Sequence, residues 1–224
     1  MDIISIILIL GATLISGGAQ AYISLNYKKY KQVLVNSGKS GFDVAREILD
    51  RNGLSNVMIL ETQGELTDHY DPSKKVVKLS HDIYNGKTIA AVSVASHECG
   101  HAIQDKNGYT FLRFRNSIVP IVNISSKFGY IAIMAGIALS LMKLIWVGIA
   151  FELVILLFQL ITLPVEFDAS RRAKIELQKC GLIDDKNVKG TSKVLKAAAY
   201  TYVAGFLSMA LQILRLVLLT RNRK

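Results

Sequence analysis

Cysteine and proline are scarce in this chain of 224 residues, which contains two Cys and three Pro. Cys99 and Cys180 are too few to build a disulfide framework, so a small disulfide-stabilised secreted domain is excluded, and a reducing compartment suits them. The near absence of Pro indicates that no long linker separates domains. No internal repeat or low-complexity tract is evident, so the chain is not a repeat array.

Acidic residues are also few, because 17 Asp and Glu stand against 27 Lys and Arg, a formal net charge of +10. A basic excess of this size occurs in proteins that bind nucleic acid. It also occurs where basic loops flank membrane helices. Because the chain contains long apolar runs, we expect the bilayer to account for its charge and predict no nucleic-acid partner.

Long apolar runs are what the sequence has in abundance, with 51% hydrophobic residues. A bilayer-spanning helix needs ~20 mostly apolar residues. Four runs reach that length, at residues 3–25, 118–142, 144–163 and 197–219. Four such runs leave too little polar sequence to wrap a buried core, so we predict an integral membrane protein, mainly α, with about four transmembrane helices. The polar residues of the last run would also suit a helix lying in the membrane interface.

The order of the runs predicts how the chain is divided. The start Met1-Asp2-Ile3 lacks basic residues and no small-x-small site closes the first run, so we expect residues 1–25 to be an N-terminal transmembrane anchor. We expect a transmembrane hairpin over residues 116–163, and a C-terminal transmembrane helix with a basic tail over residues 197–224. Glu152 and Arg215 lie inside apolar runs, where charged groups usually find a partner, so we expect them to pair.

Charge predicts the orientation. Basic residues concentrate in Lys28–Arg115 and Arg171–Lys196, whereas the connection between the second and third runs holds only Lys143. Basic loops resist translocation. We therefore expect both basic segments to face the cytoplasm from a cell (inner or plasma) membrane, with the amino terminus outside. The tail Arg221-Asn222-Arg223-Lys224 argues mildly against this arrangement if the last run spans.

The string His97-Glu98-Cys99-Gly100-His101 is an H-E-x-x-H motif within an expected helix over residues 88–105. Residues four apart lie on one face of a helix, so the two imidazoles can converge on one metal ion. Glu98 projects beside them and can hold the water that the metal activates. Cys99 falls well round the helix from that face, which indicates packing. The alternative is a pair of surface histidines on an ordinary helix.

We expect the soluble part between the first two runs, residues 26–115, to form a small α+β, zincin-like catalytic domain. Residues 41–52 are expected to form a short amphipathic helix. Three short strands are expected over residues 56–61, 65–70 and 75–80. We expect the last of these to lie at the edge of the sheet, where an extended substrate could add a strand.

Zinc requires a third protein ligand and an open position for water. His69 and His81 lie upstream of the motif, at strand ends. Glu166 and Asp168 lie just past the third apolar run, and a membrane hairpin would return them to the side where the motif helix enters. The spacing does not separate these two carboxylates, and either would also suit the start of a helix, where the macrodipole favours acids.

The chain resembles the YugP-type zinc metallopeptidases over essentially its whole length. The resemblance rests on the strings LTDHYDP, LS, ASHECGHAIQ and LPVEFDASRRA, at residues 66–72, 79–80, 95–104 and 163–173. More distantly, the chain is similar to the HtpX-like and CAAX-prenyl membrane metallopeptidases, gluzincins whose second motif is E-x-x-x-D. The resemblance implies that Glu166 is the third zinc ligand and that residues 164–196 form the third-ligand helix and a basic cytoplasmic segment. This sequence departs at the last motif position, which is Ser170.

Together these features predict a membrane-embedded zinc endopeptidase that cuts near the cytoplasmic membrane surface, with a peptide or protein substrate and the lipid bilayer as partners. His97, His101 and Glu166 would hold Zn²⁺, and Glu98 would act as general base. Four residues are candidate donors to the oxyanion: His69, Tyr70, Arg171 and Arg172.

Two other functions remain open on the same residues. One is a non-proteolytic metal-binding membrane scaffold or chaperone, against which the complete motif argues, because such a protein need not keep Glu98. The other is a transporter that uses the polar residues Lys127, Glu152 and Arg215 of the apolar runs.

Overall fold

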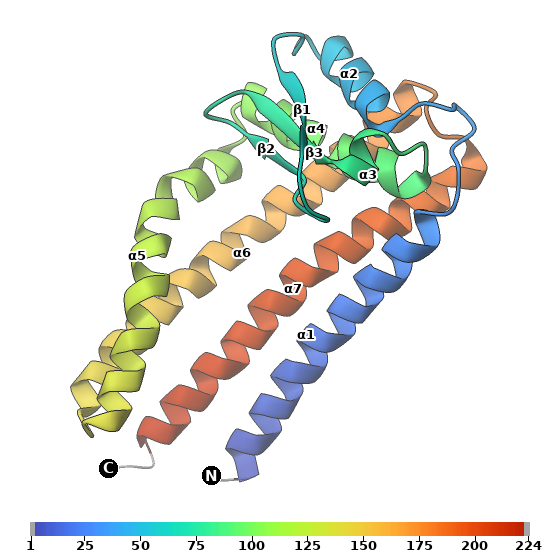
Figure 1. The fold of residues 1–224 in the computed structure, drawn as a ribbon. Coiled ribbons are helices and arrows are strands. Elements are labelled where there is room, and N and C mark those ends of the chain that lie inside the picture. The colour runs from blue at the N-terminus through green and yellow to red at the C-terminus, as the bar shows by residue number, and fades with distance from the viewer. Residues whose placement is uncertain (1–2, 222–224) are drawn as a thin grey trace. The chain divides into compact units, whose positions relative to one another are not determined.

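The structure, a computed structural model, describes residues 3–221, apart from the side chains of Asp185 and Lys186. The chain forms seven helices and three strands within that range (Figure 1). In order they are α1 (Ile3–Tyr30), α2 (Gly41–Arg51), β1 (Met58–Thr62), β2 (His69–Asp71), β3 (Val76–Ser80), α3 (His81–Tyr84), α4 (Ile89–Lys106), α5 (Thr110–Ala138), α6 (Met142–Lys179) and α7 (Asp185–Arg221). The end of the basic tail, residues 222–224, lies outside the described residues.

Four of these helices, α1, α5, α6 and α7, are long and apolar enough to cross a membrane. Their apolar stretches correspond to the four predicted runs, and the short strands make one small sheet. The predicted fold class is therefore confirmed: the chain is mainly α, with four candidate membrane helices and a small α+β region.

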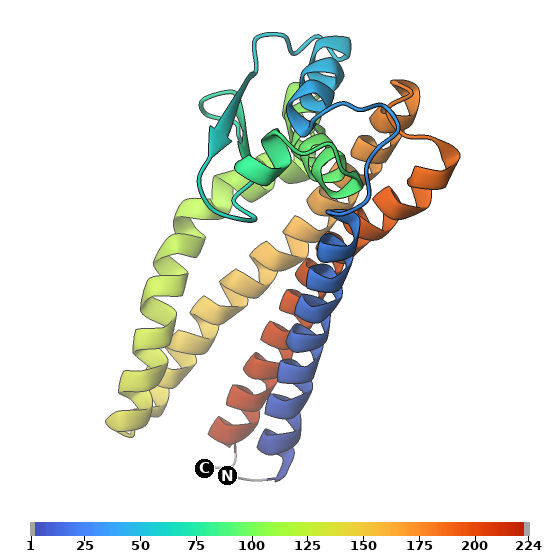
Figure 2. The same ribbon diagram turned by 45° about the vertical axis from the view of Figure 1, so that its right-hand side comes forward.

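The chain divides into two compact units. The first, which we call the membrane unit, comprises residues 3–20, 113–164 and 201–221 within the described range. The second, the motif unit, comprises Ala21–Leu112 and Val165–Tyr200, and it contains the H-E-x-x-H helix α4. Figure 2 shows the same chain from a second direction.

Small residues bring helices of the membrane unit together. A Cβ added at Gly148 of α6 would lie 2.9 Å from the Gly129 carbonyl oxygen of α5, so both glycines allow the two backbones to approach closely. Between α1 and α7, the Ser16 hydroxyl donates to Ser208 Oγ at 2.7 Å, and Ser208 in turn donates to the Ala12 carbonyl at 3.0 Å. Close packing and hydrogen bonds of this kind hold helices together where the hydrophobic effect cannot.

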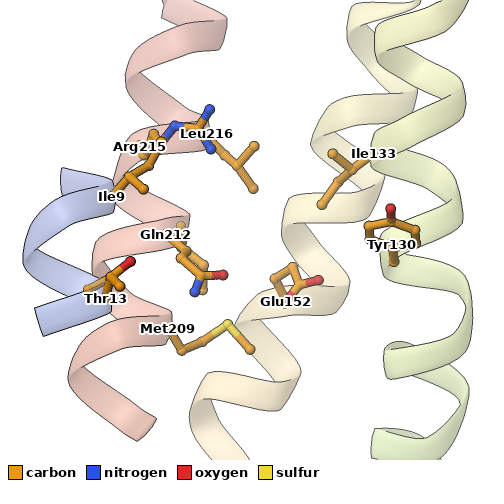
Figure 3. A pocket seen from close by; sticks show the side chains of 11 residues that line it. Ile9, Thr13, Tyr130, Ile133, Glu152, Met209, Gln212, Arg215 and Leu216 are labelled. Carbon is orange, nitrogen blue, oxygen red and sulfur yellow. The ribbon is translucent and has the colours of Figure 1, made fainter. Parts of the chain in front are cut away.

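A cavity of about 430 Å³ lies inside the membrane unit, lined by residues of α1, α5, α6 and α7 (Figure 3). Glu152 and Arg215 both line it. The expected ion pair between them is not formed, because no ion pair within 4.0 Å joins these two described residues, and Arg215 Nε has no hydrogen-bond partner. The two side chains project from different helices, α6 and α7, and both line the cavity (Figure 3).

Local sequence signals explain the helices of the motif unit. Ser40 and Asp43 form a capping box that starts α2, and the Thr88 hydroxyl accepts the backbone N–H of Ala91 at the start of α4. Both helices match the expected ranges 41–52 and 88–105 within one residue. Fourteen of the eighteen residues of α4 are buried, so it is the central helix of this unit. It packs against α2 and α3, and also contacts β2 and β3.

The sheet of the motif unit has the strand order β1-β3-β2, with β3 parallel to β1 and antiparallel to β2. The prediction that residues 75–80 form an edge strand is therefore wrong, because β3 is the central strand. Val76, Val77 and Leu79 are buried in it, which is the pattern of a strand with neighbours on both sides. The exposed edges belong to β1 and to the short strand β2.

The long helix α6 continues through Pro164 to Lys179. Proline lacks the amide hydrogen of an ordinary helical residue, but apolar helices tolerate it. The residues after the third apolar run therefore stay helical, and Glu166 and Asp168 lie inside a helix. The alternative that they are ordinary acids at a helix start does not hold.

Candidate metal centre

Helices α4 and α6 bring three predicted ligands together inside the motif unit. The candidate ligand atoms of His97, His101 and Glu166 all lie within 4.8 Å of one another. Glu166 Oε2 is 3.2 Å from His97 Nε2 and 3.7 Å from His101 Nε2. Glu166 is 2% exposed and His101 9% exposed, so the cluster is shielded from water.

These separations suit a zinc ion. Zinc binds His nitrogen and carboxylate oxygen at ~2.0–2.2 Å in tetrahedral geometry, which places two ligand atoms roughly 3.3–3.6 Å apart. The two distances from the Glu166 oxygen lie close to this range. Three protein ligands of this type also leave one tetrahedral position open, as catalytic rather than structural zinc sites do.

Glycine within the motif allows the two helices to approach at this point. A Cβ added at Gly100 would lie 2.6 Å from the Ala169 carbonyl oxygen and 3.1 Å from Ala169 Cα. Any side chain at position 100 would clash with the Ala169 backbone, so the residue that precedes His101 in the H-E-x-x-H motif has to be glycine here. The bare backbone of α4 thus lets α6 pass closely enough for Glu166 to reach both histidines.

Gln104 fixes the tautomer of His101. Its amide nitrogen donates to the Val165 carbonyl at 2.8 Å and to Asp168 Oδ2 at 3.0 Å, so its oxygen faces His101. That oxygen lies 3.0 Å from His101 Nδ1 and can only accept, so Nδ1 carries the hydrogen. In the neutral ring Nε2 therefore carries the lone pair, which is the form that binds a metal.

Ser170 has the corresponding place beside His97. Its hydroxyl lies 3.2 Å from His97 Nδ1, while His97 Nε2 faces Glu166. A serine hydroxyl can accept an N–H hydrogen bond of this kind, which orients the ring. Ser170, which stands where the E-x-x-x-D motif considered in the sequence analysis has an Asp, thus keeps a hydrogen-bonding group at that place on the helix without a negative charge.

The electrostatics of the cluster favour positive charge. Burial lowers the pKa of His101, but its hydrogen bond to Glu166 and the negative charges of Glu166 and Glu98 outweigh burial and raise the pKa above its ordinary value. A pocket that stabilises a proton in this way also stabilises a cation held by the same atoms, and metal binding displaces that proton.

The other two motif residues differ in their surroundings. Glu98 is 7% exposed and lies one residue from His97 on the same helix. Cys99 is fully buried, with its Sγ 3.6 Å from the Ala45 carbonyl of α2, and burial raises the pKa of its thiol. Cys99 therefore packs against α2, as its position in the motif indicated, and it is unreactive.

The remaining candidates lie away from the cluster. His69 Nδ1 contacts the Thr67 carbonyl of its own turn, and His81 contacts Glu61 across the sheet. Asp168 does not join the three ligand atoms, because it accepts hydrogen bonds from Gln104, Arg171 and Arg172.

The candidate oxyanion donors also have other partners. Tyr70 donates its hydroxyl to Asp105 at 2.8 Å, which together with burial raises its pKa. Arg171 and Arg172 pair with Asp168 at 2.5 Å each, and His69 is exposed. None of the four is held toward the three ligand atoms by a contact among the described residues.

The residue that sequence reasoning missed is Gln104. It follows His101 by three positions, and residues three apart on a helix are neighbours, so the spacing H-x-x-Q was a usable signal. Its complete burial indicates a structural demand for a polar group at that place. Ser170 was noticed only as a departure from a motif, and its contact with His97 was not foreseen.

Comparison with known proteins agrees with this geometry. A family model described as "Putative neutral zinc metallopeptidase" matches residues 5–221. The chain is similar to the "Putative membrane protease YugP" of Bacillus subtilis (strain 168), with 44% identity over 217 residues, which cover 97% of this chain and 96% of the relative. No solved structure matches the chain. Both matches include the membrane unit as well as the motif unit.

Proposed function

Because this chain belongs to the family described as putative neutral zinc metallopeptidases, we propose that it is a membrane-embedded zinc endopeptidase that hydrolyses peptide bonds near the cytoplasmic membrane surface. The observation that carries the proposal is the convergence of His97, His101 and Glu166 in a shielded cluster. Glu98 is buried next to His97 on the same helix, and its negative charge acts on His101. Four candidate membrane helices and the membrane-protease name of the relative support the location in a membrane.

The three ligand residues would hold the zinc ion through His97 Nε2, His101 Nε2 and a Glu166 carboxylate oxygen. When bound, zinc supplies Lewis acidity, which lowers the pKa of a coordinated water to about 7 and polarises a carbonyl oxygen. Ser170 and Gln104 orient the two imidazoles through their Nδ1 atoms, so that both Nε2 atoms are available at the same time.

Glu98 is the residue that moves protons. Its carboxylate oxygen takes a proton from the attacking water as the water oxygen bonds to the carbonyl carbon of the scissile peptide. The same oxygen then gives the proton to the amide nitrogen as the carbon–nitrogen bond breaks, so the products are a carboxylic acid and an amine, which become carboxylate and ammonium when the second water proton is transferred. Its position inside a largely buried helix keeps bulk water from competing for this proton.

The test is Glu98→Gln, measured in detergent micelles by zinc content and by cleavage of an unstructured protein such as casein. We expect zinc to be retained, because Glu98 is not a ligand, and cleavage to fall by roughly 10²–10⁴-fold, the usual contribution of a general base. Glu61→Gln is the matched control, since Glu61 is exposed and lies away from the cluster, and it should cleave normally.

Each outcome of this test is informative. Normal cleavage by Glu98→Gln would overturn the mechanism, and loss of zinc from a folded variant would make Glu98 a ligand. If the native chain binds zinc but neither form cleaves any of a broad set of membrane-anchored and soluble proteins, the non-proteolytic scaffold replaces the peptidase.

We infer the cytoplasmic location of the site from the basic loops of the motif unit, because basic loops resist translocation. A labelling scan tests it in a background with Cys99→Ala and Cys180→Ser. A reporter cysteine at exposed Lys74 should be protected from an impermeant thiol reagent in intact cells, while one at Lys143 should react. The opposite pattern would move the site to the outer face.

A further inference from the structure

A hollow of about 180 Å³ lies between α6 and α7 within the motif unit. It combines three kinds of side chain: cationic, hydroxyl and apolar. The lining residues are Phe167, Ser170, Arg171 and Lys174 of α6, and Ser192, Leu195, Lys196 and Ala199 of α7. This combination occurs in sites that bind an anionic head and an apolar tail together.

The positive charge of this hollow is only partly neutralised. Arg171 pairs with Asp168 at 2.5 Å. Neither Lys174 nor Lys196 has an ion-pair partner within 4.0 Å among the described residues. Lys196 is exposed and Lys174 half-buried, so both ammonium groups are available to an anion that enters from the surface.

The apolar part of the hollow lies on the same two helices. Phe167 is 45% exposed, although it is a large aromatic residue, and it lies only four residues after the third apolar run along α6. Four residues of helix correspond to ~6 Å. On α7, Leu195 and Ala199 stand where the last apolar run begins. The hollow thus combines basic groups with apolar residues that lie, along the chain, at the ends of two of the predicted apolar runs.

We propose that this hollow binds an anionic phospholipid, with the phosphate between Lys174 and Lys196 and the start of an acyl chain along Phe167. The charges select an anion, and basic pockets beside membrane helices are known to take such headgroups. A free phosphate would gain nothing from the apolar lining, and a neutral lipid would gain nothing from the lysines. The proposal does not depend on the peptidase activity.

The hollow also borders the metal centre, since Ser170 lines it and contacts His97. Arg171 is linked in the same way, through Asp168 and Gln104, to His101. These two residues are therefore left unchanged in the test. Lys174 and Lys196 have no such link, so changing them alters the charge of the hollow and leaves the support of the histidines in place.

The test uses the purified full chain in neutral detergent micelles. Lipid retention is measured by native mass spectrometry and the unfolding temperature by a thermal scan, with phosphatidylglycerol, phosphatidylcholine or inorganic phosphate added. We expect retention of phosphatidylglycerol and, at about 100 times its Kd, a rise in Tm of roughly 5–10 °C. Phosphatidylcholine and phosphate should give little shift.

The double variant Lys174→Gln/Lys196→Gln should bind phosphatidylglycerol roughly 30-fold more weakly, because each lysine near a membrane anion contributes about 1 kcal/mol. The matched control is Lys189→Gln/Lys193→Gln, which removes the same charge from exposed positions of α7 outside the hollow. It should bind as the native chain does.

Three results would overturn the proposal. Equal weakening by the two double variants would show diffuse attraction to the basic surface. An equal shift with phosphatidylcholine would show that headgroup charge is irrelevant. An equal shift with inorganic phosphate would show a site for free anions.

Discussion

The two units of this chain differ in how much of their apolar side-chain surface is buried. In the motif unit, apolar residues of α2, α4 and the sheet are buried in a common core, and fourteen of the eighteen residues of α4 are buried. In α1, only 11% of the apolar membrane window is buried, and Leu10 and Leu14 are more than half exposed. Water favours the buried apolar core of the motif unit, whereas a lipid solvent allows apolar side chains to stay exposed on α1. Hydropathy along the sequence therefore distinguishes the two units before any tertiary contact is known.

Buried polar atoms without a hydrogen-bond partner occur in both units. They are Ser37 Oγ, Arg46 Nε and Thr191 Oγ1 in the motif unit, and Gln159 Oε1 and Arg215 Nε in the membrane unit. What distinguishes the motif unit is the candidate metal centre, where Gln104 and Ser170 lie at hydrogen-bond distance from the Nδ1 atoms of the two histidines. Side-chain hydrogen bonds thus orient the candidate ligands in the motif unit, whereas in the membrane unit small residues bring helices together.

The largest effect that would sharpen this comparison is expected for Glu166→Ala. Loss of one of three ligands should weaken zinc binding by more than the roughly 10–100-fold typical of changes to supporting residues. Asp168→Asn is the control on the same helix and should keep zinc, because Asp168 is not among the three ligand residues. Zinc affinity is measured by competition with a chromophoric chelator. Equal affinities of Glu166→Ala and the native chain would mean that the ligand set is different.

The next largest effect is expected for Gln104→Leu. The substitution leaves the His101 Nδ1 hydrogen buried without an acceptor, so zinc affinity should fall by roughly 10–100-fold. Ser170→Ala should have a smaller effect, because His97 is less buried and water can replace the hydroxyl. Gln178→Leu changes an exposed glutamine of the same unit and serves as control. An unchanged affinity in Gln104→Leu would show that the His101 tautomer does not depend on this contact.

A smaller effect is expected when one glycine in each unit is replaced by alanine and the stabilities of the two variants are compared. Gly100→Ala brings a methyl group against the Ala169 backbone and should destabilise the fold by about 1–3 kcal/mol, the usual cost of overpacking, while loosening zinc. Gly205→Ala in the membrane unit meets nothing within 4 Å, and alanine favours helix by about 0.5–1 kcal/mol. Thermal unfolding with and without zinc checks both. A stable, fully zinc-loaded Gly100→Ala would contradict the close approach of α4 and α6.

The smallest expected effect is the coupling between Glu152 and Arg215. Because no ion pair joins them, a double-mutant cycle with Glu152→Gln and Arg215→Gln should give a coupling energy below about 0.5 kcal/mol. The cycle is measured by thermal unfolding in micelles. A coupling above about 1 kcal/mol would restore the pair that the sequence suggested, and the cavity of Figure 3 would then be closed by it.

Much of the fold could be predicted from the pattern of apolar and polar residues in the sequence. The apolar pattern placed α2 and α4 within one residue, and in the structure Ser40 and Thr88 cap the helices that follow them. Hydropathy located the four long helices, because each must be apolar on its own. Strand order did not follow: β3 was expected at an edge, and its central place depends on which neighbours it pairs with.

The residues of the candidate site differed in how far each could be predicted from the sequence. The pair His97 and His101 follows from the period of a helix, since four residues make about one turn. Spacing alone left Glu166 and Asp168 equivalent, and the resemblance chose between them. In the structure they differ because Asp168 turns toward Gln104 and the arginines, while Glu166 faces the histidines.

By itself, the sequence determined which segments are apolar enough for a membrane, where the motif helix begins, and which two side chains share a face of it. These properties depend on residues close together along the chain, through local hydrogen bonds and through the solvent that each side chain prefers. Only the tertiary structure placed Glu166, and not Asp168, beside the two histidines, put Gln104 and Ser170 next to their Nδ1 atoms, and left Glu152 and Arg215 unpaired. Those contacts depend on how closely separate helices approach, as the missing side chain of Gly100 allows α4 and α6 to do.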